Sequence, residues 1–253
     1  MLDLNFYISM WNYEAYTRPW RLEDAVHEVV EAGYGIELWP WWKDQKQLFA
    51  PENRERLKNL LRDVPSSLHS GEINGISDYF KQIDAAADTG SSVLVVHAPQ
   101  LQVAEEPDFG FAREVVAYGR EKGVLIALEN GELTHLARAV EELDDLVICL
   151  DTGHVYCSAA RERPMQEFVD ALKWRIRHLH LQDVYLKPDT RIAVNDSHRT
   201  PGYCDIPRED YEYLLEGLSE VGFTGAAVLE VRPFTPVEIA QQSKLFFESL
   251  SNS

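Results

Sequence analysis

The sequence contains little cysteine and shows no disulfide pattern. Only three of its 253 residues are cysteine (Cys149, Cys157 and Cys204), and no two of them form a CxxC motif. This argues against a disulfide framework and against a zinc site built from thiolates. The N-terminal residues also lack the basic region and the apolar run of a secretory signal. We therefore expect a protein of the reducing cytoplasm.

Positive charge and long apolar runs are scarce as well. There are 24 Lys and Arg against 42 Asp and Glu, which gives a formal net charge of −18. Proteins that bind nucleic acid or anionic membranes usually carry a basic surplus, because they neutralise phosphate groups. Apolar runs such as residues 93–96 are far shorter than the ~20 residues that span a bilayer. We therefore expect a small-molecule substrate rather than a nucleic acid or a membrane as partner.

The sequence does contain a regular alternation of β-type and helical patterns. Eight short runs of β-branched, aromatic or apolar residues are each followed by a helical pattern, with no linker or low-complexity segment between them. The strands are expected at residues 4–9, 35–39, 66–70, 93–98, 124–130, 146–151, 176–182 and 226–231. The helices are expected at residues 22–32, 52–62, 77–89, 109–122, 132–143, 164–174, 207–221 and 236–250. A doubly wound sheet is the alternative, but no GxGxxG turn is present, so the pattern favours an α/β fold with one (β/α)8 TIM barrel over residues 1–253.

Polar side chains recur at the ends of the predicted strands. In such a barrel, alternate strand residues point inward, and the last of them line the mouth at the C-terminal face, where active sites lie. The residues two positions before these strand ends are mostly small or apolar, as a packed interior requires. The residues expected at the mouth are His69, His97, Glu129, Asp151, His180 and Glu230, with Glu37 as a candidate seventh. Asp183, three residues after His180, either orients a ligand or closes a loop.

This group of imidazoles and carboxylates indicates a metal site. Burying several carboxylates together is costly unless a cation compensates them. Nitrogen and carboxylate ligands without thiolates suit Zn²⁺, Mn²⁺ or Co²⁺. We therefore expect a divalent metal ion at the mouth of the barrel.

Five sequence strings resemble the xylose isomerase-like barrel superfamily, which also includes the endonuclease IV enzymes (AP endonuclease family 2). The strings are ALEN around Glu129, CLDTGH at residues 149–154, RHLHLQD around His180, NDSHRTPGYCDI at residues 195–206, and VLEVR around Glu230. Two positions depart from the patterns of relatives. Cys204 replaces the second glycine of a frequent Gly-x-Gly turn, and His135 stands where tagatose epimerase-like enzymes usually have glutamate.

The resemblance implies two possible sets of metal ligands. In the sugar isomerases and epimerases of this superfamily, one ion is held by four side chains, which correspond here to Glu129, Asp151, His180 and Glu230. Endonuclease IV holds three ions, and its further ligands correspond to His69, His97, His154, Asp196 and His198. The resemblance therefore implies one Mn, Zn, Co or Mg ion, and up to three in the endonuclease IV-like arrangement.

The first functional hypothesis is a metal-dependent isomerase or epimerase of carbohydrate metabolism. It would act on a small sugar, sugar phosphate or polyol derivative through a metal-stabilised enediolate, with Glu129 and Glu230 as general acid and base. Aromatic residues after the first two strands, Tyr16 and Trp20 among them, could stack on sugar faces. The residues expected to bind substrate are His154, His198, Arg232, Glu37, Trp11 and Trp39.

Two alternatives remain open at this point. One is an endonuclease IV-like phosphoester hydrolase with several zinc ions, in which Glu129 bridges metals. Residues 161–208 carry 9 basic and 7 acidic residues, so this local charge of +2 offers a nucleic acid little attraction. The other is a barrel that binds a ligand without catalysis. Barrels of this superfamily often form dimers or tetramers, which makes a homo-oligomer a candidate state.

Overall fold

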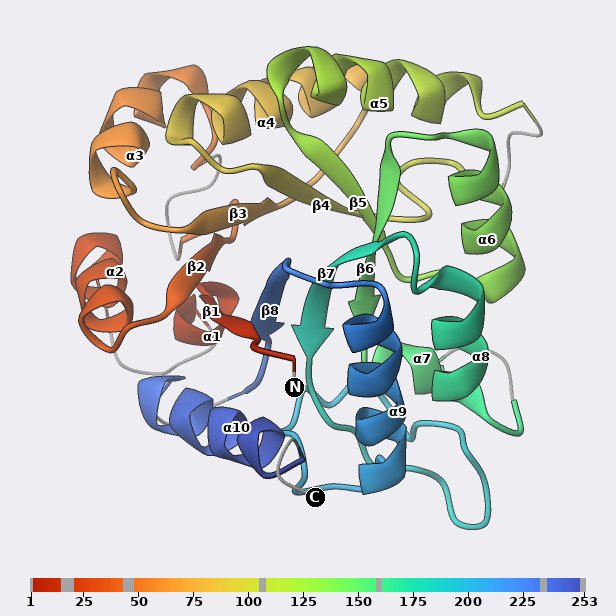
Figure 1. Ribbon diagram of the computed structural model, residues 1–253. Coiled ribbons are helices and arrows are strands. Elements are labelled where there is room, and N and C mark those ends of the chain that lie inside the picture. The colour runs from red at the N-terminus through yellow and green to blue at the C-terminus, as the bar shows by residue number, and fades with distance from the viewer. Residues whose placement is uncertain are drawn as a thin grey trace.

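The eight predicted strands form a closed parallel barrel in the order β1 to β8 (Figure 1). The computed structural model describes residues 2–14, 21–42, 48–104, 108–157, 161–232 and 236–250. The strands are Asn5–Ser9 (β1), Gly35–Leu38 (β2), Ser66–His69 (β3), Val93–His97 (β4), Leu125–Glu129 (β5), Leu146–Asp151 (β6), Ile176–Leu181 (β7) and Ala226–Leu229 (β8). Strand β8 closes the barrel against β1, with Asn5 opposite Ala226. The predicted (β/α)8 fold is confirmed.

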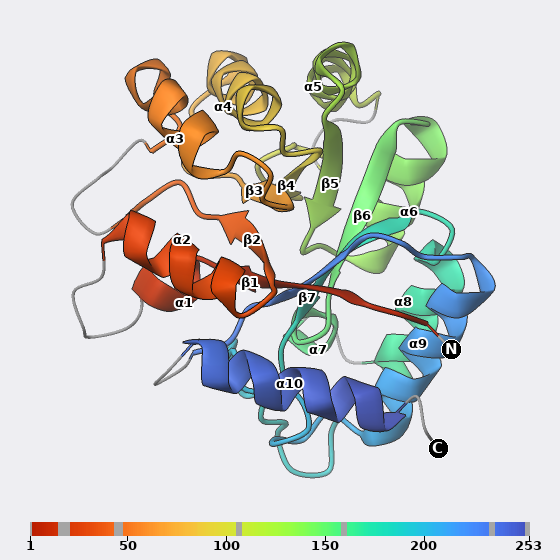
Figure 2. The same ribbon diagram turned by 60° about the vertical axis from the view of Figure 1, so that its left-hand side comes forward.

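Helices surround the barrel on its outside, as Figures 1 and 2 show from two directions. They are α2 (Leu22–Glu31), α3 (Arg54–Leu60), α4 (Ile76–Thr89), α5 (Gly110–Lys122), α6 (Leu133–Glu142), α8 (Pro164–Leu172), α9 (Arg208–Glu220) and α10 (Pro236–Leu250). Helices α4 and α5 end at Gly90 and Gly123, as predicted, where the backbone takes the left-handed conformation with φ of 77° and 73°. Glycine adopts this conformation without a steric penalty.

Short helical turns lie in three of the connecting segments. Their bounds are Trp11–Glu14 (α1), Pro51–Asn53 (η1, a 3₁₀ turn) and His154–Cys157 (α7). These turns were not predicted, because three or four residues are too few to show a helical repeat of apolar positions. Two of them matter for the site: α1 and α7 follow directly on β1 and β6, so they carry Trp11 and His154 above the carboxyl ends of the strands.

The interior of the barrel is packed, as expected. The residues two positions before the strand ends are almost fully buried, and they include Val95, Ala127 and Cys149, which form one apolar cluster with Val93 and Val147. A packed layer of this kind closes the bottom of the mouth. Polar groups that sit above it are therefore reached from the C-terminal face.

One buried carboxylate organises the long connection from β7 to α9. The Asp183 side chain accepts hydrogen bonds from the backbone N–H groups of Val184, Gly202, Cys204 and Ile206 at 2.8–3.1 Å. Burial raises the pKa of Asp183, and these backbone donors oppose that rise. Of the two roles left open by the sequence, Asp183 thus closes a loop, and it holds in place the segment that carries Asp196 and His198.

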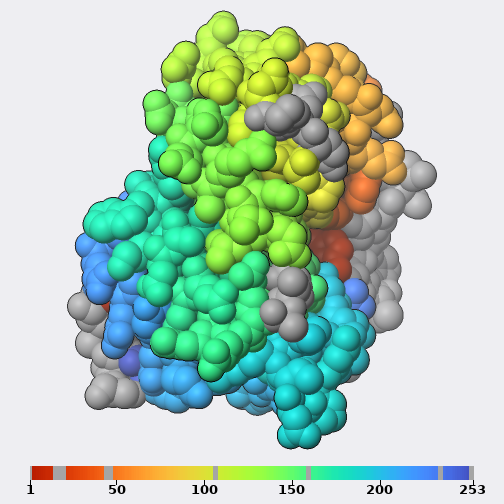
Figure 3. All heavy atoms as spheres, turned by 90° about the vertical axis from the view of Figure 1, so that its right-hand side faces the viewer, coloured from red at the N-terminus to blue at the C-terminus, as the bar shows by residue number. Residues whose placement is uncertain are grey.

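Part of the same connection projects from the surface. Leu186 and Ala193 form an isolated antiparallel bridge, and Lys187 N–H donates to the carbonyl of Ile192 at 2.8 Å. This hairpin, residues 186–193, lies in the cyan region that projects at the lower edge of the molecule in Figure 3.

Among the helices of the described residues, none has the length and apolar character that crossing a membrane requires.

Candidate metal centre

Four side chains from neighbouring strands converge at the mouth of the barrel. Glu129, Asp151 and His180 lie at or near the ends of β5, β6 and β7, and Glu230 follows the last residue of β8. One donor atom from each of the four lies within 4.8 Å of the others. His180 Nδ1 lies 3.0 Å from Glu129 Oε1 and 3.3 Å from Glu230 Oε2. We call these four residues the core group.

Two further histidines extend the core group on one side. His69 Nε2 and His97 Nε2 lie 3.3 and 3.1 Å from the same atom, Glu129 Oε2. The other oxygen of this carboxylate, Oε1, faces His180. Glu129 therefore presents one oxygen to the core group and the other to the two histidines of β3 and β4.

A third set of donors lies next to Asp151. His154 Nε2 and His198 Nε2 lie 3.0 and 2.9 Å from Asp196 Oδ2, and His154 Nδ1 lies 3.3 Å from Asp151 Oδ2. The backbone at His198 is left-handed, with φ of 46°, a conformation that few non-glycine residues adopt. We call His154, Asp196 and His198 the outer group. All nine residues that the sequence predicted as donors are thus brought together.

The close packing of opposite charges shifts the pKa of the ionisable groups. Burial would raise the pKa of Glu129, but His180, His154 and His69 lower it more strongly, to well below the usual range. Burial lowers the pKa of His180, whereas the surrounding negative groups raise it well above its usual range. The pKa of His154 is likewise raised, because Asp151 and Asp196 outweigh the effect of burial. These side chains therefore form a buried network of charged groups.

The donor chemistry fits a divalent ion. Carboxylate oxygens and imidazole nitrogens are ligands that Zn²⁺, Mn²⁺ and Co²⁺ accept. His154 Nδ1 and His180 Nε2 are buried without a hydrogen bond of acceptable geometry among the described residues, although each faces a carboxylate. Cys149 lies close to His178 and His180, but burial raises the pKa of its thiol, so it is the less suitable donor.

Metal affinity is expected to increase with pH. The neighbouring carboxylates outweigh burial and raise the pKa values of His69, His154 and His180, which favours the protonated form of these imidazoles in the metal-free protein. An ion binds only the neutral ring, so binding releases protons and becomes stronger from about pH 6 to pH 8. Calorimetric Zn²⁺ titrations in buffers of different ionisation enthalpy count the released protons. An affinity that is constant or falls over this range would contradict the prediction.

Aromatic rings line the rim of the site. The ring of Trp39 lies 4.5 Å from that of His69, and the ring of Trp11 lies 4.7 Å from that of His198. The guanidinium of Arg232 lies 5.5 Å from the centre of the Trp11 ring, and Arg232 is exposed. These three predicted substrate-binding residues therefore lie at the mouth. Tyr16 and Trp20 fall outside the described residues.

The structure corrects the prediction for Glu37. This side chain is fully buried and pairs in register with Ser67, one layer below His69. Its carboxylate oxygens lie 2.8 Å from His178 Nε2 and from His180 Nε2. A substrate at the mouth does not reach a group that is covered in this way, so a substrate-binding role and a place at the rim are both wrong.

One residue of the site, Gln182, was missed in the sequence. Its Nε2 donates to both carboxylate oxygens of Asp151 at 3.0 Å and to Asp196 Oδ1 at 3.3 Å. Its Oε1 accepts the backbone N–H of His198 at 3.0 Å. Gln182 thus connects the core group to the outer group. The alternation of inward positions, two residues after His180, was the signal that could have identified it.

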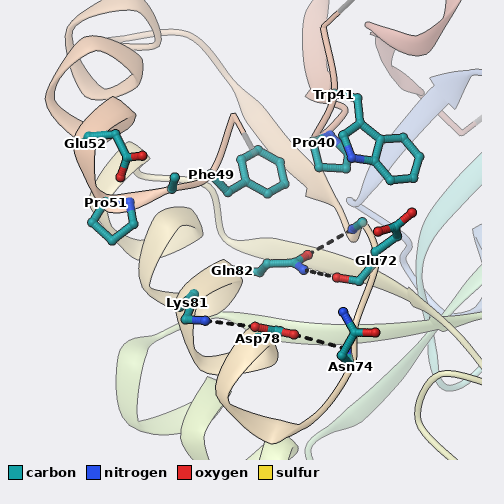
Figure 4. Close-up of a pocket in the computed structure, with 12 residues that line it drawn as sticks. Pro40, Trp41, Phe49, Pro51, Glu52, Glu72, Asn74, Asp78, Lys81 and Gln82 are labelled. Carbon is teal, nitrogen blue, oxygen red and sulfur yellow. Dashed lines mark hydrogen bonds and ion pairs between the residues drawn. The ribbon is translucent and has the colours of Figure 1, made fainter. Parts of the chain in front are cut away.

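A separate cavity lies apart from these donors. A cavity of about 330 Å³ is found between the segment after β2 and helix α4 (Figure 4). Pro40, Trp41 and Phe49 line its apolar part, while Gln82 donates to and accepts from the backbone at its inner edge. None of the predicted site residues is among those that line it. The chemistry of the donors, and not the size of a cavity, identifies the candidate site.

The comparisons with known proteins agree with the fold. A family model described as "Xylose isomerase-like TIM barrel" matches residues 26–250. A search of curated proteins finds no match.

Solved structures share the fold at low sequence identity. A D-tagatose 3-epimerase-like protein aligns with a TM-score of 0.74 at 20% identity, over 98% of this chain and 97% of that one. A Thermus thermophilus protein soaked with ZnCl2 gives 0.71 at 19% identity, over 99% and 98%. A xylose isomerase-like barrel protein from Mycobacterium smegmatis, in complex with magnesium, gives 0.69 at 15% identity, over 98% and 97%. The match of the family model over most of the sequence shows that the chain belongs to the xylose isomerase-like TIM barrel family.

Proposed function

We propose that this chain is a divalent-metal-dependent isomerase or epimerase of a small sugar, sugar phosphate or polyol derivative. The observation that carries the proposal is the core group, in which three carboxylates and one imidazole place their donor atoms within 4.8 Å of one another. Two of these carboxylates, Glu129 and Glu230, face the same nitrogen of His180. Similarity to a D-tagatose 3-epimerase-like structure supports the reaction class by analogy.

In this proposal the two glutamates move the proton that is bound to carbon. Glu129 and Glu230 come from β5 and β8, which are separated by β6 and β7, so they approach a substrate from different parts of the rim. Glu129, acting as base, would accept the carbon-bound proton, and Glu230, acting as acid, would give its own proton to the carbon. A divalent ion held by Glu129, Asp151, His180 and Glu230 would stabilise the negative charge that develops on the substrate oxygens.

The residues at the rim suit a small polar ligand. The rings of Trp11 and Trp39 lie against the imidazoles of the site and offer apolar faces to a sugar. Arg232, stacked on Trp11, is placed to receive a hydroxyl or an anionic group. The net charge of −18 disfavours a long polyanion such as DNA.

A count of bound metal together with an exchange assay tests the proposal. The purified protein is analysed for metal content, and pentoses, hexoses and their phosphates are incubated with it in D2O. We expect one tightly bound ion per chain and, for at least one sugar, loss of the proton signal at the carbon next to the carbonyl. Metal binding without exchange or turnover of any sugar would support a barrel that only binds its ligand.

One observation favours a second candidate function. The imidazoles around Glu129 are divided between its two carboxylate oxygens. One of its oxygens faces His180 and the other faces His69 and His97, as a carboxylate that bridges two ions would do. With the outer group, this arrangement suits a phosphoester hydrolase with two or three zinc ions. Two or more ions per chain, together with cleavage of bis-p-nitrophenyl phosphate or of an abasic oligonucleotide, would replace the isomerase proposal by this one.

A further inference from the structure

A buried carboxylate lies beneath the core group and touches one of its members. Glu37 is 0% exposed, and its Oε1 lies 2.8 Å from His180 Nε2. The opposite ring nitrogen of His180, Nδ1, faces Glu129 and Glu230. The imidazole of His180 therefore stands between the carboxylates of the core group and the carboxylate of Glu37.

The second oxygen of Glu37 is held by other residues. His178 Nε2 lies 2.8 Å from Glu37 Oε2, and Ser67 Oγ donates to the same oxygen at 3.0 Å. These contacts from β3 and β7 fix the orientation of the carboxylate, so that Oε1 stays directed at His180.

Burying the charge of Glu37 costs free energy unless neighbouring groups compensate it. Glu37 is fully buried and lies 2.8 Å from both His178 Nε2 and His180 Nε2, so two imidazoles are placed to compensate its charge. Removing one partner of a buried ion pair is costly, because the other partner is left uncompensated. The contact of Glu37 with a proposed metal ligand, His180, points to a role in the metal site.

We propose that Glu37 is a positioning residue that holds His180 as the Nε2–H tautomer and so directs Nδ1 to the metal ion. In the metal-loaded protein, Glu37 would accept the Nε2 proton across this 2.8 Å contact, fix the ring plane and increase the basicity of Nδ1, as carboxylates behind metal-bound histidines do. The inference rests on the proposed metal site but not on the identity of the reaction.

The variant Glu37→Gln tests this role, because it keeps the size of the side chain and removes its charge. We expect the dissociation constant for Zn²⁺, measured by competition with a chelator, to increase by about 10–100-fold. Glu132→Gln is the matched control: it makes the same change of charge at a side chain that is 45% exposed and pairs with Arg161, so its affinity for Zn²⁺ should equal that of the parent. Thermal unfolding of the metal-free variants shows whether the barrel itself is intact. An unchanged affinity in Glu37→Gln would overturn the proposal.

A measurement on the unaltered protein decides the question if Glu37→Gln does not fold. Long-range 1H–15N NMR spectra of the zinc-loaded protein, labelled on histidine, distinguish the two tautomers of each ring. His180, identified by the loss of its signals in His180→Gln, should carry its proton on Nε2. A proton on Nδ1 would contradict the proposal. If Glu37 behaves as expected while no sugar is converted, the proposed function fails and the role of Glu37 stands.

Discussion

Glu129→Gln is expected to lower the turnover of a confirmed substrate by about 10²–10⁴-fold, which is the usual contribution of a general acid or base. The loss has two physical causes. An amide cannot accept the carbon-bound proton, and it no longer offers anionic oxygens to His180, His69 and His97, which now lie around Oε1 and Oε2. Metal affinity should therefore fall together with turnover. Steady-state kinetics at saturating metal separates the two effects.

Glu132→Gln is the control for this experiment. Glu132 lies three residues further along the chain, and its side chain is 45% exposed in a contact with Arg161. The same change of charge at this position should leave both turnover and metal content unaltered. Normal turnover in Glu129→Gln would remove Glu129 from the acid–base role.

Asp183→Ala is expected to have the largest effect on stability, a loss of about 3–5 kcal/mol. The four backbone N–H groups that donate to this carboxylate would lose their acceptor, and a buried donor without a partner is costly. The segment with Asp196 and His198 would then be released, so the affinity of the outer group for metal should fall as well. Urea unfolding of the metal-free protein measures the loss of stability.

Asp144→Ala provides the comparison, because the Asp144 side chain is 96% exposed. Its effect on unfolding should stay within about 0.5 kcal/mol. Equal effects of the two substitutions would show that the contacts of Asp183 contribute little to the fold.

The barrel was predictable because local patterns repeat along the chain. Each strand is a short β-type run, each long helix has an apolar face, and Gly90 and Gly123 mark two of the helix ends. The short turns α1 and α7 escaped prediction, since their helical form depends on the surroundings and not on a repeat. The ends of strands were predicted within one or two residues, and Glu230 lies just beyond β8 rather than within it.

The part of the candidate site that lies at the strand ends was predictable, because inward-pointing and outward-pointing residues alternate along each strand. Six of the nine expected donors converge because they lie at or next to the ends of neighbouring strands, whose inward positions meet at the mouth. The other three, His154, Asp196 and His198, were expected from the family resemblance and lie on α7 and on the connection from β7 to α9. Glu37 was misplaced because its depth depends on the stagger between β2 and β3, where it pairs with Ser67. That register is a property of the closed barrel and cannot be read from one strand. The link formed by Gln182 likewise depends on the path of the loop that carries Asp196.

The connection from β7 to α9 contains two parts, the projecting hairpin of residues 186–193 and the segment that carries Asp196 and His198. The tip of the hairpin, residues 187–190, is exposed and belongs to the part that projects in Figure 3. Its base is tied by the Leu186–Ala193 bridge, by the ion pair of Arg191 with the buried Asp210, and by the Asp183 contacts. Changes in chain length at the tip therefore need not be transmitted to Asp196 and His198, which lie beyond the tied base. The tip is accordingly the natural place to insert an affinity tag or a fluorescent label for immobilising the protein or following it during turnover.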